Sequence, residues 1–121
     1  MKAIVTDDSK ATRTILSKLM QDLNFEVEEA ADGGQLLEVL TREAVDICLI
    51  DSNMPGMTGT EVIRIMKSHP AWKNIPSILV TDEIASERMN GALEAGASGC
   101  LGRPLKIEKL TDLLKRLGLE Q

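Results

Sequence analysis

The sequence predicts an α/β protein in which a parallel five-stranded sheet carries helices on both faces. Five short runs of apolar or β-branched residues alternate with five longer stretches whose apolar residues recur every three or four positions. Two short runs, Asp46–Ile50 and Ser77–Val80, are almost continuously hydrophobic, which is typical of central strands buried on both faces. The 121 residues, 43% hydrophobic and 27% charged, suit one globular domain.

The first two strand–helix units are indicated by their strands and by the signals at the ends of their helices. The strands are predicted at Ala3–Thr6 and Val27–Ala30. Ser9 can cap the first helix and Asp32 the second, while Asn24 stands where the first helix should end. The apolar stripes of these helices are predicted at Ala11, Ile15, Leu19 and Leu23, and at Leu36, Leu37 and Leu40.

The other three units carry similar signals. Their strands are predicted at Ile47–Ile50, Ile78–Thr81 and Gly99–Leu101. Thr58, with Glu61 three residues later, predicts a capping box for the third helix. Pro76 precedes the fourth strand, where its missing N–H costs least, and Gly96 and Gly118 should end helices. The stripes are predicted at Val62, Ile63 and Met66, at Ala85, Met89, Ala92 and Leu93, and at Ile107, Leu110, Leu114 and Leu117.

Charge and composition exclude several classes of partner. A net charge of −5 with one Phe, one Trp and no Tyr lacks both the phosphate-neutralising charge and the stacking surface that nucleic acid requires. No apolar run approaches membrane-spanning length, and the N-terminus does not resemble a signal peptide. Cys48 and Cys100 are far apart, without ligands at metal-binding spacing, so we expect two buried free thiols and a cytoplasmic protein.

Charged and hydroxyl side chains follow the predicted strands. Asp7 and Asp8 come after the first strand, Asp51 after the third, Thr81 ends the fourth, and Arg103 follows the fifth. In open parallel sheets these carboxyl ends lie along one edge, where ligands bind. Clustered carboxylates repel one another, and a hard cation that prefers oxygen ligands relieves that repulsion. The sequence therefore predicts a magnesium site at this edge.

At these positions the sequence resembles the receiver domain of two-component response regulators, specifically the chemotaxis type that stands alone. The resemblance rests on Val5–Asp8, Ile50–Gly59, Val80–Thr81 and Ala95–Pro104. It implies a flavodoxin-like (βα)5 fold with strand order 2-1-3-4-5. Five strand–helix units use nearly the whole chain, so we expect residues 1–121 to form a single receiver domain. A flavin is not expected, because Asp7 and Asp8 would repel its phosphate.

The resemblance assigns roles to these residues. Asp51 resembles the phosphoacceptor, which takes a phosphoryl group from a phosphohistidine and forms an acyl phosphate. Asp8, Asp51 and the backbone carbonyl of Asn53 resemble the Mg²⁺ ligands, with Asp7 supporting the metal largely through water. Thr81 resembles the switch hydroxyl that moves to the phosphoryl group and shifts the population toward the active state.

Two positions depart from the family pattern. Arg103 stands before Pro104 where the family has Lys, and we expect its guanidinium to engage the acidic cluster and contact the phosphate. Cys100 stands where many members have Tyr or Phe, so we do not expect a switch that relies on an aromatic rotor. Asn53 and Glu83 occupy the positions that in the family tune hydrolysis of the acyl phosphate.

The resemblance implies a signalling switch without enzymatic turnover. A histidine kinase or phosphotransfer protein would dock at the first helix, and an effector protein at the face formed by the fourth helix, fifth strand and fifth helix. The charged residues expected on that face are Glu87, Arg88, Glu94, Lys106 and Lys109. Two alternatives stay open: an interaction module independent of phosphorylation, favoured by Arg103 and Cys100, and a magnesium-dependent phosphatase, disfavoured because Asn53 stands where a second acid–base Asp is needed.

Overall fold

A computed structural model describes residues 1–82 and 87–120, with the backbone alone for residues 87–89. The strands are β1 (Lys2–Thr6), β2 (Glu26–Ala30), β3 (Ile47–Asp51), β4 (Ser77–Thr81) and β5 (Gly99–Gly102). The helices are α1 (Lys10–Asp22), α2 (Gly33–Arg42), α3 (Gly59–Ser68), α4 (Glu87–Ala95) and α5 (Ile107–Arg116). In the described ranges, no helix has the length and apolar character that crossing a membrane requires.

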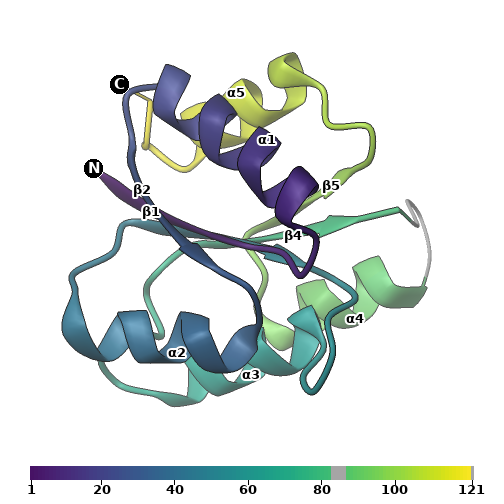
Figure 1. The fold of residues 1–121 in the computed structure, drawn as a ribbon. Coiled ribbons are helices and arrows are strands. Elements are labelled where there is room, and N and C mark those ends of the chain that lie inside the picture. The colour runs from purple at the N-terminus through teal and green to yellow at the C-terminus, as the bar shows by residue number, and fades with distance from the viewer. Residues whose placement is uncertain (83–86, 121) are drawn as a thin grey trace.

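The five strands form one parallel sheet in the order β2-β1-β3-β4-β5, which confirms the predicted fold class and strand order. Helices α1 and α5 cover one face of the sheet, and α2, α3 and α4 cover the other (Figure 1). Strand β1 lies between β2 and β3, so the carboxyl ends of β1 and β3 are neighbours. This adjacency positions the acidic residues that follow the two strands.

Alternate residues of the sheet feed two aliphatic cores. Leu49 on β3 packs on the α1 and α5 side with Met20 and Leu110, and all three side chains are fully buried. Ile50, the next residue of β3, packs on the opposite side with Leu36 and Met66. Because both faces are covered, the central strands carry apolar residues at nearly every position. The near-continuous hydrophobic runs in the sequence have this cause.

The predicted helix signals are confirmed. Ser9 and Asp32 each accept a hydrogen bond from the backbone N–H three residues later, at 3.4 and 2.8 Å. Thr58 and Glu61 form the capping box, with both hydrogen bonds at 3.2 Å. Positive φ angles follow helices α1, α4 and α5 at Asn24 (72°), Gly96 (114°) and Gly118 (73°). Each conformation belongs to the left-handed region in which helices commonly end.

The predicted stripe of α1 was wrong at its N-terminal end. Ile15 is 62% exposed, whereas Leu16 and Met20 are buried against the sheet. The predicted residues were four positions apart, and each such step advances about 40° beyond a full turn. A stripe of this kind winds around the helix. Only its C-terminal members, Leu19 and Leu23, pack against the core.

Smaller corrections concern the last two units. Leu93 and Ile107, predicted on core stripes, are 49% and 38% exposed. Cys48 is buried and free as predicted, but Cys100 is only partly buried, because β5 is an edge strand of the sheet. The predictions for Ala85 and for the side chain of Met89 concern parts of the chain outside the described residues.

Candidate functional site

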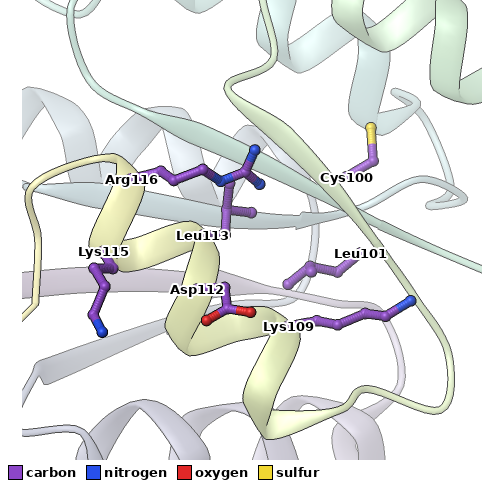
Figure 2. A pocket seen from close by; sticks show the side chains of 7 residues that line it. All are labelled: Cys100, Leu101, Lys109, Asp112, Leu113, Lys115 and Arg116. Atoms are coloured by element: carbon purple, nitrogen blue, oxygen red, sulfur yellow. The ribbon is translucent and has the colours of Figure 1, made fainter.

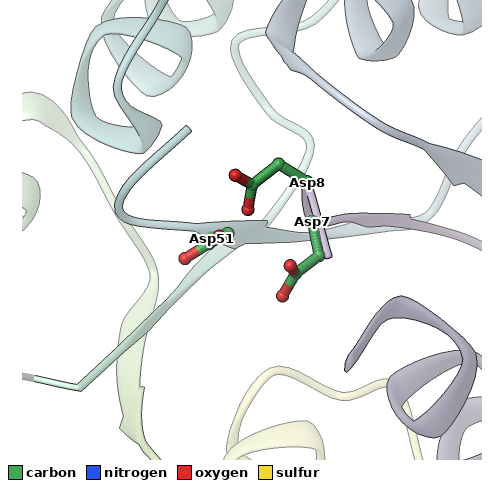
Figure 3. Close-up of side chains that lie close together, drawn as sticks. All are labelled: Asp7, Asp8 and Asp51. Carbon is green, nitrogen blue, oxygen red and sulfur yellow. The ribbon is translucent and has the colours of Figure 1, made fainter. Parts of the chain in front are cut away.

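Three aspartates meet at the carboxyl edge of the central strands (Figure 3). Thr6 of β1 pairs in register with Ile50 of β3, so Asp7 and Asp8 emerge beside Asp51. One carboxylate oxygen from each of the three residues lies within 4.8 Å of the others. The parallel register therefore brings together side chains that are far apart in sequence.

Asp7 and Asp8 differ in their surroundings. Asp7 is 1% exposed, and its Oδ1 accepts a hydrogen bond from the Ser9 N–H at 2.9 Å, directly before α1. The Arg13 side chain donates to the backbone carbonyl of Asp7 at 2.9 Å. Asp8 is exposed, and within the described part of the chain no hydrogen bond or ion pair engages its carboxylate. Asp7 is thus fixed by the protein, while Asp8 is available to a ligand.

Asp51 is the buried carboxylate at the end of β3, with 5% of its surface exposed. Its Oδ1 accepts a hydrogen bond from the Asn53 N–H at 3.3 Å. Burial raises the pKa of the Asp51 carboxyl above its usual range; the Asn53 N–H opposes the rise, the Asp7 carboxylate adds to it, and the Arg103 guanidinium opposes it. The protein alone therefore undercompensates the negative charge of Asp51.

The segment that follows Asp51 is held by close backbone packing. The Ser52 N–H donates to the Val80 carbonyl at 2.9 Å, which extends the pairing of β3 with β4, and the Gly59 N–H donates to the Ser52 carbonyl at 3.2 Å. A Cβ at Gly59 would lie 2.5 Å from the Asp51 carbonyl oxygen and 2.7 Å from Leu79 Cδ1. The start of α3 can approach the site because residue 59 has no side chain.

Arg103 extends from the end of β5 into the acidic cluster. Its Nη2 lies 2.7 Å from Asp7 Oδ2, its Nη1 lies 3.3 Å from Asp51 Oδ1, and Nη1 is 3.8 Å from Asp82. The Arg103 N–H donates to the Thr81 carbonyl at 3.0 Å, which fixes the backbone beside β4. The Arg103 side chain is 22% exposed, and its guanidinium joins two carboxylates at the ends of different strands.

The remaining predicted positions lie on the same edge or outside the described range. Thr81 ends β4 and is 1% exposed, beside the strand that carries Asp51. Glu83 lies outside the described residues. Sequence reasoning missed Arg13, whose position one turn after Ser9 puts it above the end of β1 and is the signal that could have indicated it. It also did not predict which carboxylates Arg103 would join.

The donor set fits a hard divalent cation. Carboxylate oxygens are preferred ligands of Mg²⁺, and one exposed and two buried carboxylates converge here. Asn53, two residues after Asp51, lines the same hollow as the three aspartates. No nitrogen or sulfur ligand belongs to this cluster of the described residues, so its chemistry favours Mg²⁺ over zinc or copper.

Comparisons with known proteins identify the family and the fold of the chain. The family model of the response regulator receiver domain matches residues 3–115. The chemotaxis protein CheY of Pseudomonas aeruginosa is 31% identical over 118 residues, which cover 97% of this chain and 95% of that protein. The crystallised chemotaxis protein CheY4 of Vibrio cholerae has a TM-score of 0.87 and 34% sequence identity, covering 95% of this chain and 96% of its own.

A more distant structure shares the fold. The receiver domain of a sensor histidine kinase from Pseudomonas aeruginosa has a TM-score of 0.86 at 23% sequence identity, over 95% of this chain and 94% of its own. That structure is described as having a magnesium ion coordinated in its active-site cleft.

Proposed function

The chain belongs to the response regulator receiver domain family, whose members are signalling switches of two-component systems, and we propose that residues 1–121 form one such switch, phosphorylated on Asp51. The observation that carries the proposal is the cluster of Asp7, Asp8 and Asp51, with carboxylate oxygens within 4.8 Å of one another. Thr81, at the end of the neighbouring β4, supplies the hydroxyl that a switch of this family uses.

The proposed chemistry is transfer of a phosphoryl group from a histidine of a partner protein. A carboxylate oxygen of Asp51 attacks the phosphorus, the phosphorus–nitrogen bond breaks, and its electron pair leaves with the imidazole. The Asn53 N–H holds the Asp51 carboxylate in place, and Thr81 then hydrogen-bonds the new phosphoryl group. This is a single transfer to the protein itself, which suits a switch rather than an enzyme with turnover.

The proposed cofactor is Mg²⁺, held by Asp8, Asp51 and the backbone carbonyl of Asn53, with Asp7 in support. When bound, it offsets charge on the transferring phosphoryl group and aligns it with the nucleophile. Support comes from the oxygen-only donor set and from the undercompensated charge of Asp51. The magnesium ion in the distant receiver structure is consistent with the same use of the fold.

The proposed partners are a cytoplasmic histidine kinase or phosphotransfer protein, contacting α1, and an effector protein at the face of α4, β5 and α5. A hollow of about 480 Å³ lies on that face between β5 and α5, and Cys100, Lys109, Asp112 and Arg116 are among its lining residues (Figure 2). Glu94 and Lys106 are also exposed there, whereas the side chains of residues 87 and 88 are outside the described part. Such charged surroundings suit a transient contact.

One observation favours a second candidate, an interaction module that works without phosphorylation. Arg103 already joins Asp7 to Asp51 at 2.7 and 3.3 Å. A guanidinium bound to both carboxylates stabilises the resting arrangement, and the partly exposed Cys100 provides no aromatic ring to report a change at the site. In this candidate the fold and its output face are retained while Asp51 stays unmodified.

Acetyl phosphate with Mg²⁺, followed by intact-protein mass spectrometry, distinguishes the candidates. We expect the chain to gain one phosphoryl group and Asp51→Asn to gain none. Asp46→Asn, which changes the acidic residue before the amino end of the same strand, is the matched control and should gain the group like the wild type. Absence of uptake in the wild type would support the interaction module, and sustained release of phosphate from simple phosphomonoesters would support the phosphatase.

A further inference from the structure

We infer that Arg103 is a resident cation that competes with Mg²⁺ for the acidic cluster and so lowers the affinity of the site for the metal. The inference rests on the magnesium site proposed above and concerns how this chain regulates it. It is carried by the two contacts of the Arg103 fork, which reach carboxylates on two different strands.

Arg103 occupies oxygens that the metal site would use. Its Nη2 takes Asp7 Oδ2 at 2.7 Å, while Asp7 Oδ1 is already bound by the Ser9 N–H. Its Nη1 shares Asp51 Oδ1 with the Asn53 N–H, each at 3.3 Å. Of the three carboxylates, that of Asp8 alone has no partner within the described residues. A cation that binds Asp51 through Oδ1 has to displace the guanidinium.

Repulsion gives the same result if the metal uses the other oxygen of Asp51. Mg²⁺ binds carboxylate oxygens at about 2 Å, which would bring it within roughly 5 Å of a guanidinium nitrogen bound to the same carboxylate. Like charges at that distance, partly shielded from water, repel substantially. The Arg103 side chain is 22% exposed, so solvent screens this repulsion only in part.

The planar guanidinium of arginine is better suited than the compact ammonium of lysine to compete with a metal at this site. The two terminal nitrogens of Arg103 contact two carboxylates simultaneously, and the backbone hydrogen bond from Arg103 to Thr81 holds the base of the side chain. A lysine ammonium at position 103 would act as a single point charge. Competition between the guanidinium and the metal then determines the fraction of the protein that has Mg²⁺ bound at a given Mg²⁺ concentration.

The test is isothermal titration calorimetry at low ionic strength, in which Mg²⁺ is titrated into the wild-type chain, Arg103→Gln and Arg103→Lys. We expect Arg103→Gln to bind Mg²⁺ at least about 5-fold more tightly than the wild type, with Arg103→Lys between the two. Thermal unfolding with and without Mg²⁺ provides a second readout, because tighter binding to the folded state raises Tm further. A gain in affinity is a result that mere loss of structure does not produce.

Arg13→Gln is the matched control. Arg13 is a partly buried arginine near the same carboxyl edge, with its side chain 16% exposed, but it binds Glu29 and the backbone carbonyl of Asp7 instead of the clustered carboxylates. Removing its charge should change the Mg²⁺ affinity by less than about 2-fold. An equal gain in Mg²⁺ affinity in both glutamine variants would show that loss of any nearby positive charge strengthens metal binding. It would overturn the specific role of Arg103.

The remaining outcomes are also decisive. Equal or weaker Mg²⁺ binding by folded Arg103→Gln would overturn the competition while leaving the magnesium site intact. Binding by Arg103→Gln where the wild type shows none would be its strongest support. Absence of Mg²⁺ binding in every protein would remove the magnesium site and the competition together, whereas phosphorylation of Asp51 is judged separately by mass.

Discussion

The two halves of the carboxyl edge differ in how they relate to the family pattern. The ends of β1 and β3 present Asp7, Asp8 and Asp51 in the arrangement that the receiver resemblance implies. The β4–β5 side combines the buried Thr81 at the end of β4 with Arg103 after β5 and the partly exposed Cys100 within β5, and Arg103 and Cys100 depart from the residues expected of the family. Under the proposed function, the first half would supply the groups for phosphoryl transfer, and the second half would supply the groups that respond to it.

This difference indicates that chemistry and response can vary separately within one fold. The acidic half depends on the buried central strands, where close packing leaves little freedom. The other half includes the edge strand β5, whose Cys100 is partly exposed and whose following residue Arg103 reaches across the rim. Changes on an edge strand disturb fewer packed neighbours.

The largest expected effect is a loss of stability caused by Gly59→Ala, which disturbs the acidic half of the edge. A Cβ there would meet the Asp51 carbonyl oxygen at 2.5 Å, and backbone cannot move away as a flexible side chain can. We expect the free energy of unfolding to fall by about 3 kcal/mol. Thermal unfolding should show a Tm lower by roughly 10 °C.

Gly91→Ala on α4 is the matched control for that substitution. Beyond the backbone of its own helix, a Cβ at Gly91 meets no atom of the described residues within 4 Å, so the same change should stabilise the helix by about 0.5–1 kcal/mol. Equal behaviour of the two alanine variants would contradict the claim that close backbone approach holds the Asp51 segment.

The next effect compares two carboxylates of the cluster in metal-free buffer at pH 7. Asp7→Asn weakens the 2.7 Å ion pair with Arg103 and should cost about 1–2 kcal/mol. Asp51→Asn should instead stabilise the protein by about 1 kcal/mol, because burial raises the pKa of Asp51 and its charged form is disfavoured in the folded state. Denaturant titration measures both changes.

The pH dependence of the Asp51→Asn variant follows from the direction of the shift. The folded-state pKa of Asp51 lies above the unfolded value, so the penalty is absent below the unfolded pKa and grows as the pH rises through the folded pKa. The gain from Asp51→Asn should therefore be present at pH 7 and disappear near pH 3. A gain that persists at low pH would show a cause other than charge.

The smallest effect concerns reactivity rather than stability and compares the thiols of the central strand β3 and the edge strand β5. Cys48 is fully buried, and burial raises its pKa to about 12, so it should not react with Ellman's reagent in the native protein. Cys100 is partly exposed, but burial also raises its pKa, so it should react more slowly than a free cysteine and faster as the pH rises. Rapid reaction of both native thiols would contradict the rigid packing of β3.

Local signals in the sequence predicted more than long-range ones. The caps at Ser9, Asp32 and Thr58 were predictable because each depends on residues within one turn. The rotation of α1 was not, because spacing alone does not fix which part of a winding stripe meets the sheet, and Ile15 was misplaced for that reason. The acidic cluster was predictable because its residues follow predicted parallel strands, and the topology of such a sheet brings the carboxyl ends of the strands to one edge.

The contacts of Arg103 were beyond the reach of sequence reasoning. The presence of a cation after the fifth strand was visible, but its choice of Asp7 and Asp51 depends on the path of β5 and on the backbone hydrogen bond to Thr81. A side chain with several rotatable bonds can reach several acceptors on one rim, and the packing around it decides among them.

The parallel register that unites the site also determines when it can exist. Arg103 and Asp7 are 96 residues apart in the chain, and Arg103 and Asp51 are 52 apart. Contacts of this kind form only after long segments have closed into loops, so they contribute to stability late in folding. During synthesis the strands bearing the aspartates leave the ribosome before β5. The contacts of Arg103 therefore form only once the last strand has joined the sheet, whereas the three aspartates are brought together by the pairing of β1 with β3 alone.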